Sequence, residues 1–157
     1  MTKYKRAGAH NYSDATAWST TSGGANDTTA PTAADDVILD SASGNLTLDG
    51  TPACRSFNCA RSTNYAGVLT HTAGVTLSVG DGTAGLDNVA IKLASGMTYT
   101  LGNATTSAIS LISTSTTEQS VDFAGKTTGN ITYNGVNGKW KHTGTQAMGA
   151  SATATLE

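Results

Sequence analysis

The amino-acid sequence predicts an all-β protein, wound as a right-handed parallel β-helix of about four coils behind an N-terminal cap. The first observation behind this prediction is the composition. Of the 157 residues, 28 are Thr, 15 Ser, 18 Gly and 10 Asn, whereas only two are Glu. Thr and Gly are unfavourable inside helices, and few strong helix formers are present to offset them. A net charge of −2 and only two prolines are also unlike a disordered protein.

The second observation is a regular succession of short apolar segments and turn residues from residue 35 onward. Apolar and polar positions alternate within segments of about five residues, and Gly, Asn, Asp and Thr separate the segments, which indicates strands joined by turns. The twelve predicted strands span residues 36–40, 45–49, 55–59, 68–72, 75–79, 89–93, 97–101, 108–113, 120–123, 130–133, 139–143 and 152–156.

The third observation is that the apolar centres of these strands recur about every 31 residues, a period typical of stacked repeats. The three series are Leu69, Tyr99 and Ile131; Leu77, Ile109 and Trp140; and Ile91, Val121 and Thr153. Three strands per period would form one triangular coil, in which each strand pairs with its equivalent in the next coil. An antiparallel β-sandwich remains the alternative, because regularly spaced turns also suit that fold.

The sequence divides into an N-terminal arm and cap, residues 1–34, and the β-helix, residues 35–157. Because an open end of a solenoid exposes its core and its last row of backbone donors, a cap with large side chains is expected there. Trp18 and Tyr12 are the predicted capping residues. At the other end, residues 152–156 form a strand without a cap, so we expect either a partner protein or further protein to cover it.

Cys54 and Cys59 are predicted to be buried free thiols. If residues 53–60 formed one extended strand, the two cysteines would lie roughly 16 Å apart, beyond the reach of a disulfide, and on opposite faces. Neither a His nor a second Cys pair stands at metal-ligand spacing, so no metal and no cofactor are expected.

Lys3, Tyr4, Lys5 and Arg6 form the only cationic cluster of the sequence. One interpretation is a frayed, solvated terminus. The other is an arm that docks on an acidic neighbouring subunit, since Arg and Tyr are common interface anchors. We predict these four residues, together with Leu156 in the uncapped last strand, as partner contacts.

Several classes of function are disfavoured by charge and hydropathy. A pI near 5.8 without basic blocks gives no electrostatic footprint for nucleic acid. The longest aliphatic run, residues 37–39, is far shorter than the roughly 20 residues of a membrane span. The first eight residues do not lead into an apolar signal-peptide core, so no export signal is expected.

A polysaccharide hydrolase or lyase is the first enzymatic hypothesis, because such chemistry needs two carboxylates about 5 to 9.5 Å apart. Asp122 is the acid placed in the middle of a predicted strand, and a residue of an adjacent coil would have to complete the pair. The Gly/Asp-rich residues 80–88 are interpreted as a turn rather than a calcium site, because the stretch occurs once.

The remaining polar candidates have ordinary structural interpretations. His10, His71 and His142 are scattered without a nucleophile signature nearby, and His71 has the strand parity of the apolar Leu69. Alternation in residues 139–142 places Trp140 and His142 on one face and two lysines on the other. That segment is therefore predicted to be a strand rather than a single-strand nucleic-acid site.

Three stretches carry a resemblance to a known group of proteins. Residues 9–19 (AHNYSDATAWS), Gly23 with Gly24, and residues 31–40 (PTAADDVILD) resemble the opening of bacteriophage virion proteins predicted to be β-helical. They are also similar, more loosely, to the start of G8-type β-helix domains. Threonine-rich strands such as residues 67–72 continue the likeness to the phage group over most of the sequence.

The resemblance implies a non-enzymatic structural part of a phage particle, located on the virion surface after synthesis in the host cytoplasm. Capsid decoration is favoured over a tail or fibre part. The implied partners are other virion proteins, namely major capsid or tail proteins, and further copies of the same protein in a homotrimer. No nucleic acid or membrane is expected as a partner. A tail fibre or tailspike module that binds or cleaves host polysaccharide, and a bacterial adhesin fragment, remain the alternatives.

Overall fold

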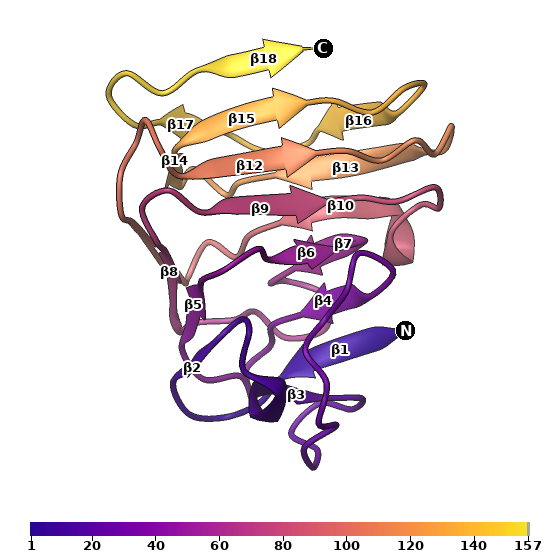
Figure 1. Ribbon diagram of the computed structural model, residues 1–157, viewed down its shortest axis with the longest axis vertical. Helices are drawn as coiled ribbons and strands as arrows, with labels where there is room; N and C mark the ends of the chain where they lie inside the picture. Colours follow the sequence, from indigo (N-terminus) through magenta and orange to yellow (C-terminus); the bar gives the residue numbers. More distant parts are fainter. Residues whose placement is uncertain (157) are drawn as a thin grey trace.

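The structure is a computed structural model that describes residues 1–156. It contains eighteen β-strands and two short 3-10 helices, η1 (Ala15–Ala17) and η2 (Leu86–Asn88). The prediction of an all-β protein is confirmed. Figure 1 shows that the strands cross the long axis of the molecule and are stacked along it, with β1 and β3 at one end and β18 at the other.

The largest sheet has seven strands in the order β16-β13-β10-β7-β4-β1-β3. Their bounds are β1 (Thr2–Lys5), β3 (Trp18–Ser19), β4 (Asp36–Ile38), β7 (Ser56–Asn58), β10 (Val89–Lys92), β13 (Glu118–Asp122) and β16 (Lys139–His142). All neighbours in this sheet are parallel except β1 and β3. Because β3 runs antiparallel along the outer side of β1, it pairs backbone groups that would otherwise form an open edge.

Three smaller sheets contain the other strands, and all their pairs are parallel. The four-stranded sheet holds β2 (His10–Asn11), β5 (Leu46–Leu48), β8 (Val68–His71) and β11 (Thr98–Leu101). The five-stranded sheet holds β6 (Ala53–Cys54), β9 (Thr76–Val79), β12 (Ala108–Leu111), β15 (Asn130–Tyr133) and β18 (Ala154–Leu156). The two-stranded sheet holds β14 (Thr127–Thr128) and β17 (Ala147–Met148).

The antiparallel β-sandwich is wrong, because parallel pairing dominates every sheet. Consecutive strands in the sequence lie in different sheets rather than side by side, as a meander would require. Each of the twelve predicted segments overlaps an observed strand. The sheets also continue across the predicted boundary at residue 34, since β1 pairs with β4 and β2 pairs with β5.

The predicted register is correct for one period and then wrong. Leu69 pairs with Tyr99, Leu77 with Ile109, and Ile91 with Val121, as the series required.

In the next row, fewer residues separate the paired positions of neighbouring strands. Ile131 lies beside Ile109, 22 residues away, and His142 lies beside Val121, 21 residues away. The reason is loop length. Nine residues separate β9 from β10 and six separate β11 from β12, whereas in the next row six separate β12 from β13 and Gly129 alone separates β14 from β15. Strand pairing fixes which side chains face inward but leaves surface loops free to differ.

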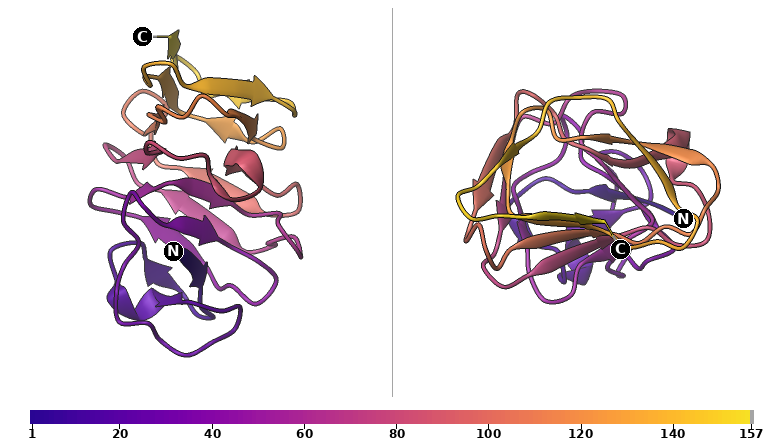
Figure 2. Two further views of the ribbon diagram at one scale, coloured as in Figure 1. Left: turned by 90° about the vertical axis from the view of Figure 1, so that its right-hand side faces the viewer. Right: turned by 90° about the horizontal axis from the view of Figure 1, so that it is seen from above.

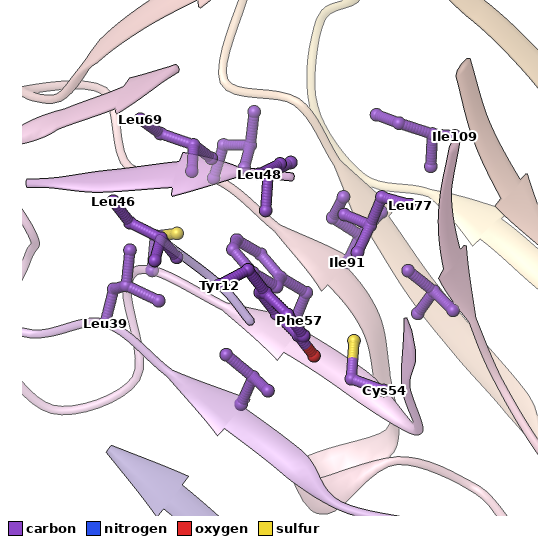
Figure 3. Packing of buried hydrophobic residues seen from close by; sticks show 14 of the residues in the cluster. Tyr12, Leu39, Leu46, Leu48, Cys54, Phe57, Leu69, Leu77, Ile91 and Ile109 are labelled. Atoms are coloured by element: carbon purple, nitrogen blue, oxygen red, sulfur yellow. The ribbon is translucent and has the colours of Figure 1, made fainter. Parts of the chain in front are cut away.

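The hydrophobic core is formed by rows of inward-facing side chains from the three larger sheets. Val37, Phe57, Ile91 and Val121 align in register along the seven-stranded sheet. Similar rows from the other two sheets pack against it in one buried cluster, which contains Leu46, Leu69, Leu77 and Ile109 (Figure 3). Seen along the long axis, the strands lie at the periphery around this interior (Figure 2). Each fully buried side chain of this kind stabilises the fold by about 1.5–3 kcal/mol.

Candidate functional site

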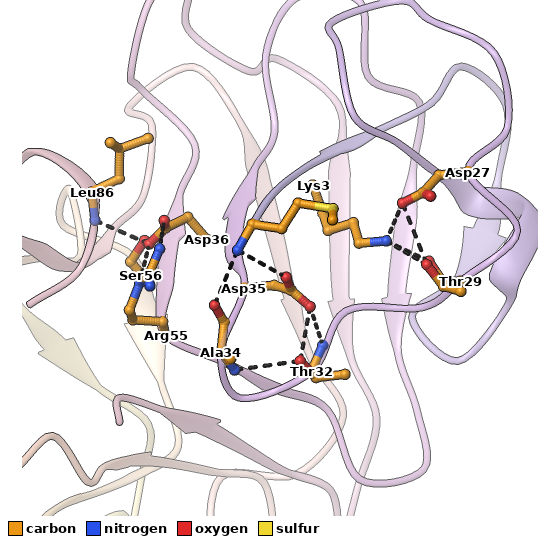
Figure 4. Close-up of polar contacts among 11 residues, drawn as sticks. Lys3, Asp27, Thr29, Thr32, Ala34, Asp35, Asp36, Arg55, Ser56 and Leu86 are labelled. Carbon is orange, nitrogen blue, oxygen red and sulfur yellow. Dashed lines mark hydrogen bonds and ion pairs between the residues drawn. The ribbon is translucent and has the colours of Figure 1, made fainter. Parts of the chain in front are cut away.

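A buried carboxylate, Asp36 on β4, has the densest set of polar contacts near the N-terminal end (Figure 4). Its side chain accepts hydrogen bonds from two nitrogens of Arg55, from Ser56 Oγ at 2.7 Å and from the Leu86 backbone N–H at 3.0 Å. Burial raises the pKa of Asp36, but these donors outweigh it and hold the pKa below its usual value. The carboxylate therefore joins β4, the start of β7 and η2.

Most of the predicted docking arm belongs to strand β1 of the largest sheet. Both lysines of this strand are buried. Lys3 Nζ forms an ion pair with Asp27 and a hydrogen bond with Thr29, as Figure 4 shows. Lys5 Nζ donates to the carbonyls of Arg6 and Gly8 at 2.6 and 2.9 Å. The frayed, solvated terminus is therefore wrong for Lys3 and Lys5, and so is the docking arm, because both ammonium groups are already bound inside the protein.

The environment of Lys5 also changes its titration. Burial and, to a smaller extent, the charge of Arg6 lower the pKa of Lys5 to about 8, against a smaller opposite effect of Asp14. The two other residues of the predicted arm, Tyr4 and Arg6, are half-buried. Leu156 is 82% exposed. The partner contacts of these three residues stay predictions.

The predicted capping residues Tyr12 and Trp18 are both buried and in contact with each other. Their rings meet edge to face, with centroids 5.1 Å apart, and Trp18 Nε1 donates to the Tyr12 carbonyl at 3.0 Å. Tyr12 Oη donates to the Ala53 carbonyl at 2.6 Å, which ties it to β6. Trp18 belongs to β3, the strand that runs along the outer side of β1.

Cys54 and Cys59 are buried free thiols, which confirms that prediction. The assumption of one extended strand is wrong, because β6 ends at Cys54 and β7 begins at Ser56 in a different sheet. The backbone turns at Arg55, so both cysteines reach the core despite their odd spacing. Burial raises the pKa of both thiols, with a smaller effect of Cys54 on Cys59, and disfavours their reactive thiolate forms.

Asp122 lines an open groove of about 220 Å³, and its Oδ1 accepts the Ala124 backbone N–H at 2.8 Å. Lys92, its neighbour in register on β10, also lines the groove. Among the described residues of this groove, no second carboxylate accompanies Asp122. The acid pair expected for glycoside cleavage is therefore not assembled there.

The other candidates occupy local roles. In residues 80–88, Asp81 accepts the Thr83 backbone N–H at 2.7 Å, as the interpretation as a turn predicts. Lys139 and Lys141 on β16 are exposed. Trp140 is half-buried and packs against Tyr133, with ring centroids 5.6 Å apart. His10 pairs with Asp14 at 3.0 Å.

His71 is a fully buried histidine held between two partners. Its Nε2 lies 3.0 Å from the Val75 carbonyl, which can only accept, so this nitrogen carries the proton. Its Nδ1, 2.6 Å from Tyr99 Oη, then accepts the phenol hydrogen. Burial lowers the pKa of His71 against a smaller effect of the Val75 hydrogen bond, which favours the neutral ring.

We expect acid to weaken the fold through His71. The unfolded state binds a proton at His71 more readily than the folded state does. The stabilisation by the neutral ring is therefore complete above the unfolded pKa of about 6.5, and the free energy of unfolding falls by about 1 kcal/mol per pH unit below it. Urea denaturation between about pH 7.5 and 5.5, around that value, measures the slope. The slope should be smaller in His71→Gln than in the wild type, and unchanged in the control His142→Gln. Equal slopes in all three proteins would contradict the assignment.

Comparisons with known proteins found no matching family model, no matching curated protein and no matching solved structure. Within residues 1–156, no group of three or more His, Cys, Asp or Glu side chains is placed to hold a metal ion. None of the helices in the described part of the protein is long and apolar enough to cross a membrane.

Proposed function

We propose that this protein is a non-enzymatic structural component of a bacteriophage virion, displayed on the particle surface as a capsid decoration or cement protein. We also propose that it winds as a right-handed parallel β-helix. Successive strands visit the seven-, four- and five-stranded sheets in a fixed order, as β4, β5 and β6 and then β7, β8 and β9 do. This order supports helical winding, and connections between parallel strands are right-handed in about 98% of cases.

In this proposal five coils begin at β4, β7, β10, β13 and β16, one more than the approximate four expected from the period. In the last two coils the two-stranded sheet of β14 and β17 takes the place of the four-stranded sheet. Strands β1 and β2 continue the stack at the N-terminal end, beneath β4 and β5.

The observation that carries the structural role is the register of hydroxyl side chains on successive strands of two sheets, the five-stranded and the four-stranded. Ser78, Ser110, Thr132 and Thr155 occupy one row of neighbouring strands in the five-stranded sheet. Thr47, Thr70 and Thr100 occupy a second row in the four-stranded sheet.

Hydroxyl rows of this kind, backed by a packed core, support a rigid and slowly unfolding module of the sort a particle component needs. The resemblance of residues 9–19, 23–24 and 31–40 to phage virion proteins supports the same role.

The proposed partners are the major capsid or tail proteins of the particle and two further copies of this protein in a homotrimer. Nucleic acid, membrane and cofactor have no part in this proposal. Tyr4, Arg6 and Leu156 are the proposed attachment residues. Strands β16 and β18 are the last strands of their sheets, so one side of each backbone is open to a partner strand.

Immunogold labelling of purified particles that carry the gene should place the protein on the capsid surface. Leu156→Glu should reduce its incorporation about fivefold or more, because a buried interface anchor contributes more than about 1 kcal/mol. The control is Val136→Glu, which replaces another exposed aliphatic side chain in the loop before β16, 76% exposed, and it should leave incorporation unchanged. Absence of gold label from the purified particles would contradict the proposal. Equal effects of the two variants would contradict the role of Leu156.

The groove beside Asp122 favours one second candidate, a tail fibre module that binds or cleaves host polysaccharide. Lys92 and Asp122 bring an ammonium and a carboxylate to the same depression, where they could bind sugar hydroxyls. Turnover of capsular polysaccharide by the purified protein, abolished in Asp122→Asn, would replace the structural proposal. Gold label at the tail rather than the capsid would also favour the tail fibre module.

A further inference from the structure

We propose that Asn134 is a site of spontaneous deamidation, and that the fold makes it react faster than its near neighbour Asn137. The sequence contains two Asn–Gly pairs, Asn134 with Gly135 and Asn137 with Gly138, and both lie in the loop between β15 and β16. Both asparagine side chains are exposed to water. Glycine hinders attack by its own backbone nitrogen least, because it has no side chain.

In the proposed reaction, the backbone nitrogen of Gly135 attacks Cγ of Asn134. The nitrogen loses its proton to a solvent base and forms the new N–Cγ bond, while the bond between Cγ and the amide nitrogen Nδ2 breaks and ammonia leaves. Water then opens the resulting succinimide ring at either carbonyl, which places an aspartate or an isoaspartate at position 134. One water is consumed and one ammonia is released, and no oxidant or reductant takes part.

The two pairs differ in the hydrogen bonding of the attacking nitrogen. The Gly138 N–H donates to the Gly135 carbonyl at 2.8 Å and closes a turn, so it must lose this bond before it can attack. Within the described residues, the Gly135 N–H donates no such bond. Because a typical hydrogen bond stabilises by about 1 kcal/mol net, Asn137 should react about three- to tenfold more slowly than Asn134.

Packing explains why glycine occupies both reactive positions. A β-carbon at Gly135 would lie 2.0 Å from the Ser113 carbonyl oxygen, and one at Gly138 would lie 2.2 Å from the same atom. Both positions also lie against the ring of Trp140. An isoaspartate would add a methylene to the backbone of this loop, and either product would add a negative charge beside the edge strand β16. Deamidation therefore alters the surface around Trp140.

One proteolytic fragment of the full-length protein tests the proposal. Trypsin cleavage after Lys126 and Lys139 yields residues 127–139, which contain Asn130, Asn134 and Asn137. The folded protein is incubated at mildly alkaline pH in water enriched in a heavy oxygen isotope, so that each new carboxyl is labelled. Fragment mass spectra over several days then give the rate at each asparagine.

We expect label at Asn134 to appear about three- to tenfold faster than at Asn137, in line with one hydrogen bond. Asn130 is the internal control, since it lies in β15 before the β-branched Ile131, and it should stay unlabelled. In urea the rates at the two Asn–Gly pairs should become equal, because the turn hydrogen bond is lost. The variant Asn134→Gln should lose its label and leave the rate at Asn137 unchanged.

Three results would overturn the proposal. The first is an unlabelled Asn134 in the folded protein. The second is a rate at Asn137 equal to or above that at Asn134. The third is a rate difference that persists in urea, because it would show that local sequence rather than the fold sets the order.

Discussion

Replacing Asp36 by alanine is expected to lower the free energy of unfolding by about 3–5 kcal/mol, the usual cost of breaking a buried ion pair from one side. Asp36 is 2% exposed and accepts bonds from Arg55, Ser56 Oγ and the Leu86 backbone N–H. Without the carboxylate, a guanidinium, a buried hydroxyl and a backbone N–H lose their shared acceptor. Urea denaturation followed by circular dichroism measures the loss.

The matched control is Asp87→Asn, which removes the charge of a surface Asp–Arg pair and keeps a residue type that tolerates the positive φ of 58° at this position. The side chains of Arg61 and Asp87 are 33% and 53% exposed, so this pair should contribute at most about 1 kcal/mol. Asp36→Asn keeps one acceptor oxygen and should fall between the two. Equal losses in Asp36→Ala and Asp87→Asn would show that the buried contacts of Asp36 add nothing.

The same carboxylate gives the fold an acid limit. Because the pKa of folded Asp36 is lowered, its stabilisation is complete above the unfolded value of about 3.9 and is lost as the pH falls through the folded value. In Asp36→Ala this part of the acid sensitivity should be absent. The difference in stability between wild type and variant should therefore shrink as the solution is acidified below about pH 4.

The strands were largely predictable because alternation reports which side chains face inward. The recurrence of apolar centres about every 31 residues gave the correct partners of Leu69, Leu77 and Ile91 in the next row. Alternation failed for strands of two residues, such as β6 and β2, which are too short to alternate. The turn at Arg55 between β6 and β7 was invisible for this reason, and the faces assigned to the cysteines were wrong.

The polar network near the N-terminal end could not be predicted, because its partners are distant in sequence. Arg55 lies 19 residues from Asp36, and Leu86 lies 50 residues from it. The prediction for the two lysines of β1 was wrong for a different reason, since their charge suggested that they are exposed. Alternation in β1 would have placed Lys3 and Lys5 on one face, but only the fold shows that Asp27 and backbone carbonyls receive their ammonium groups there.

Trp18→Ala should lower the free energy of unfolding by about 3–5 kcal/mol, as for other large-to-small changes of a buried tryptophan. The indole is fully buried, stacks edge to face on Tyr12 and donates from Nε1 to the Tyr12 carbonyl. Truncation leaves a cavity and also removes the donor of that hydrogen bond. Trp140→Ala at the opposite end should cost less, because that side chain is only half-buried and its Nε1 has no partner within the described residues.

Hydrogen exchange can separate a capping role of Trp18 from a purely stabilising one. Trp18 lies on β3, which pairs with β1 at the edge of the seven-stranded sheet, so a cap should protect the strands nearest to it. In Trp18→Ala we expect amides of β1 and β4 to exchange by local opening, while those of β12 exchange only by global unfolding. Trp18→Phe, which keeps a large ring but loses the N–H, should restore most of this protection. Loss of protection by the same amount in β1, β4 and β12 would instead mean that Trp18 stabilises the whole fold without closing its end.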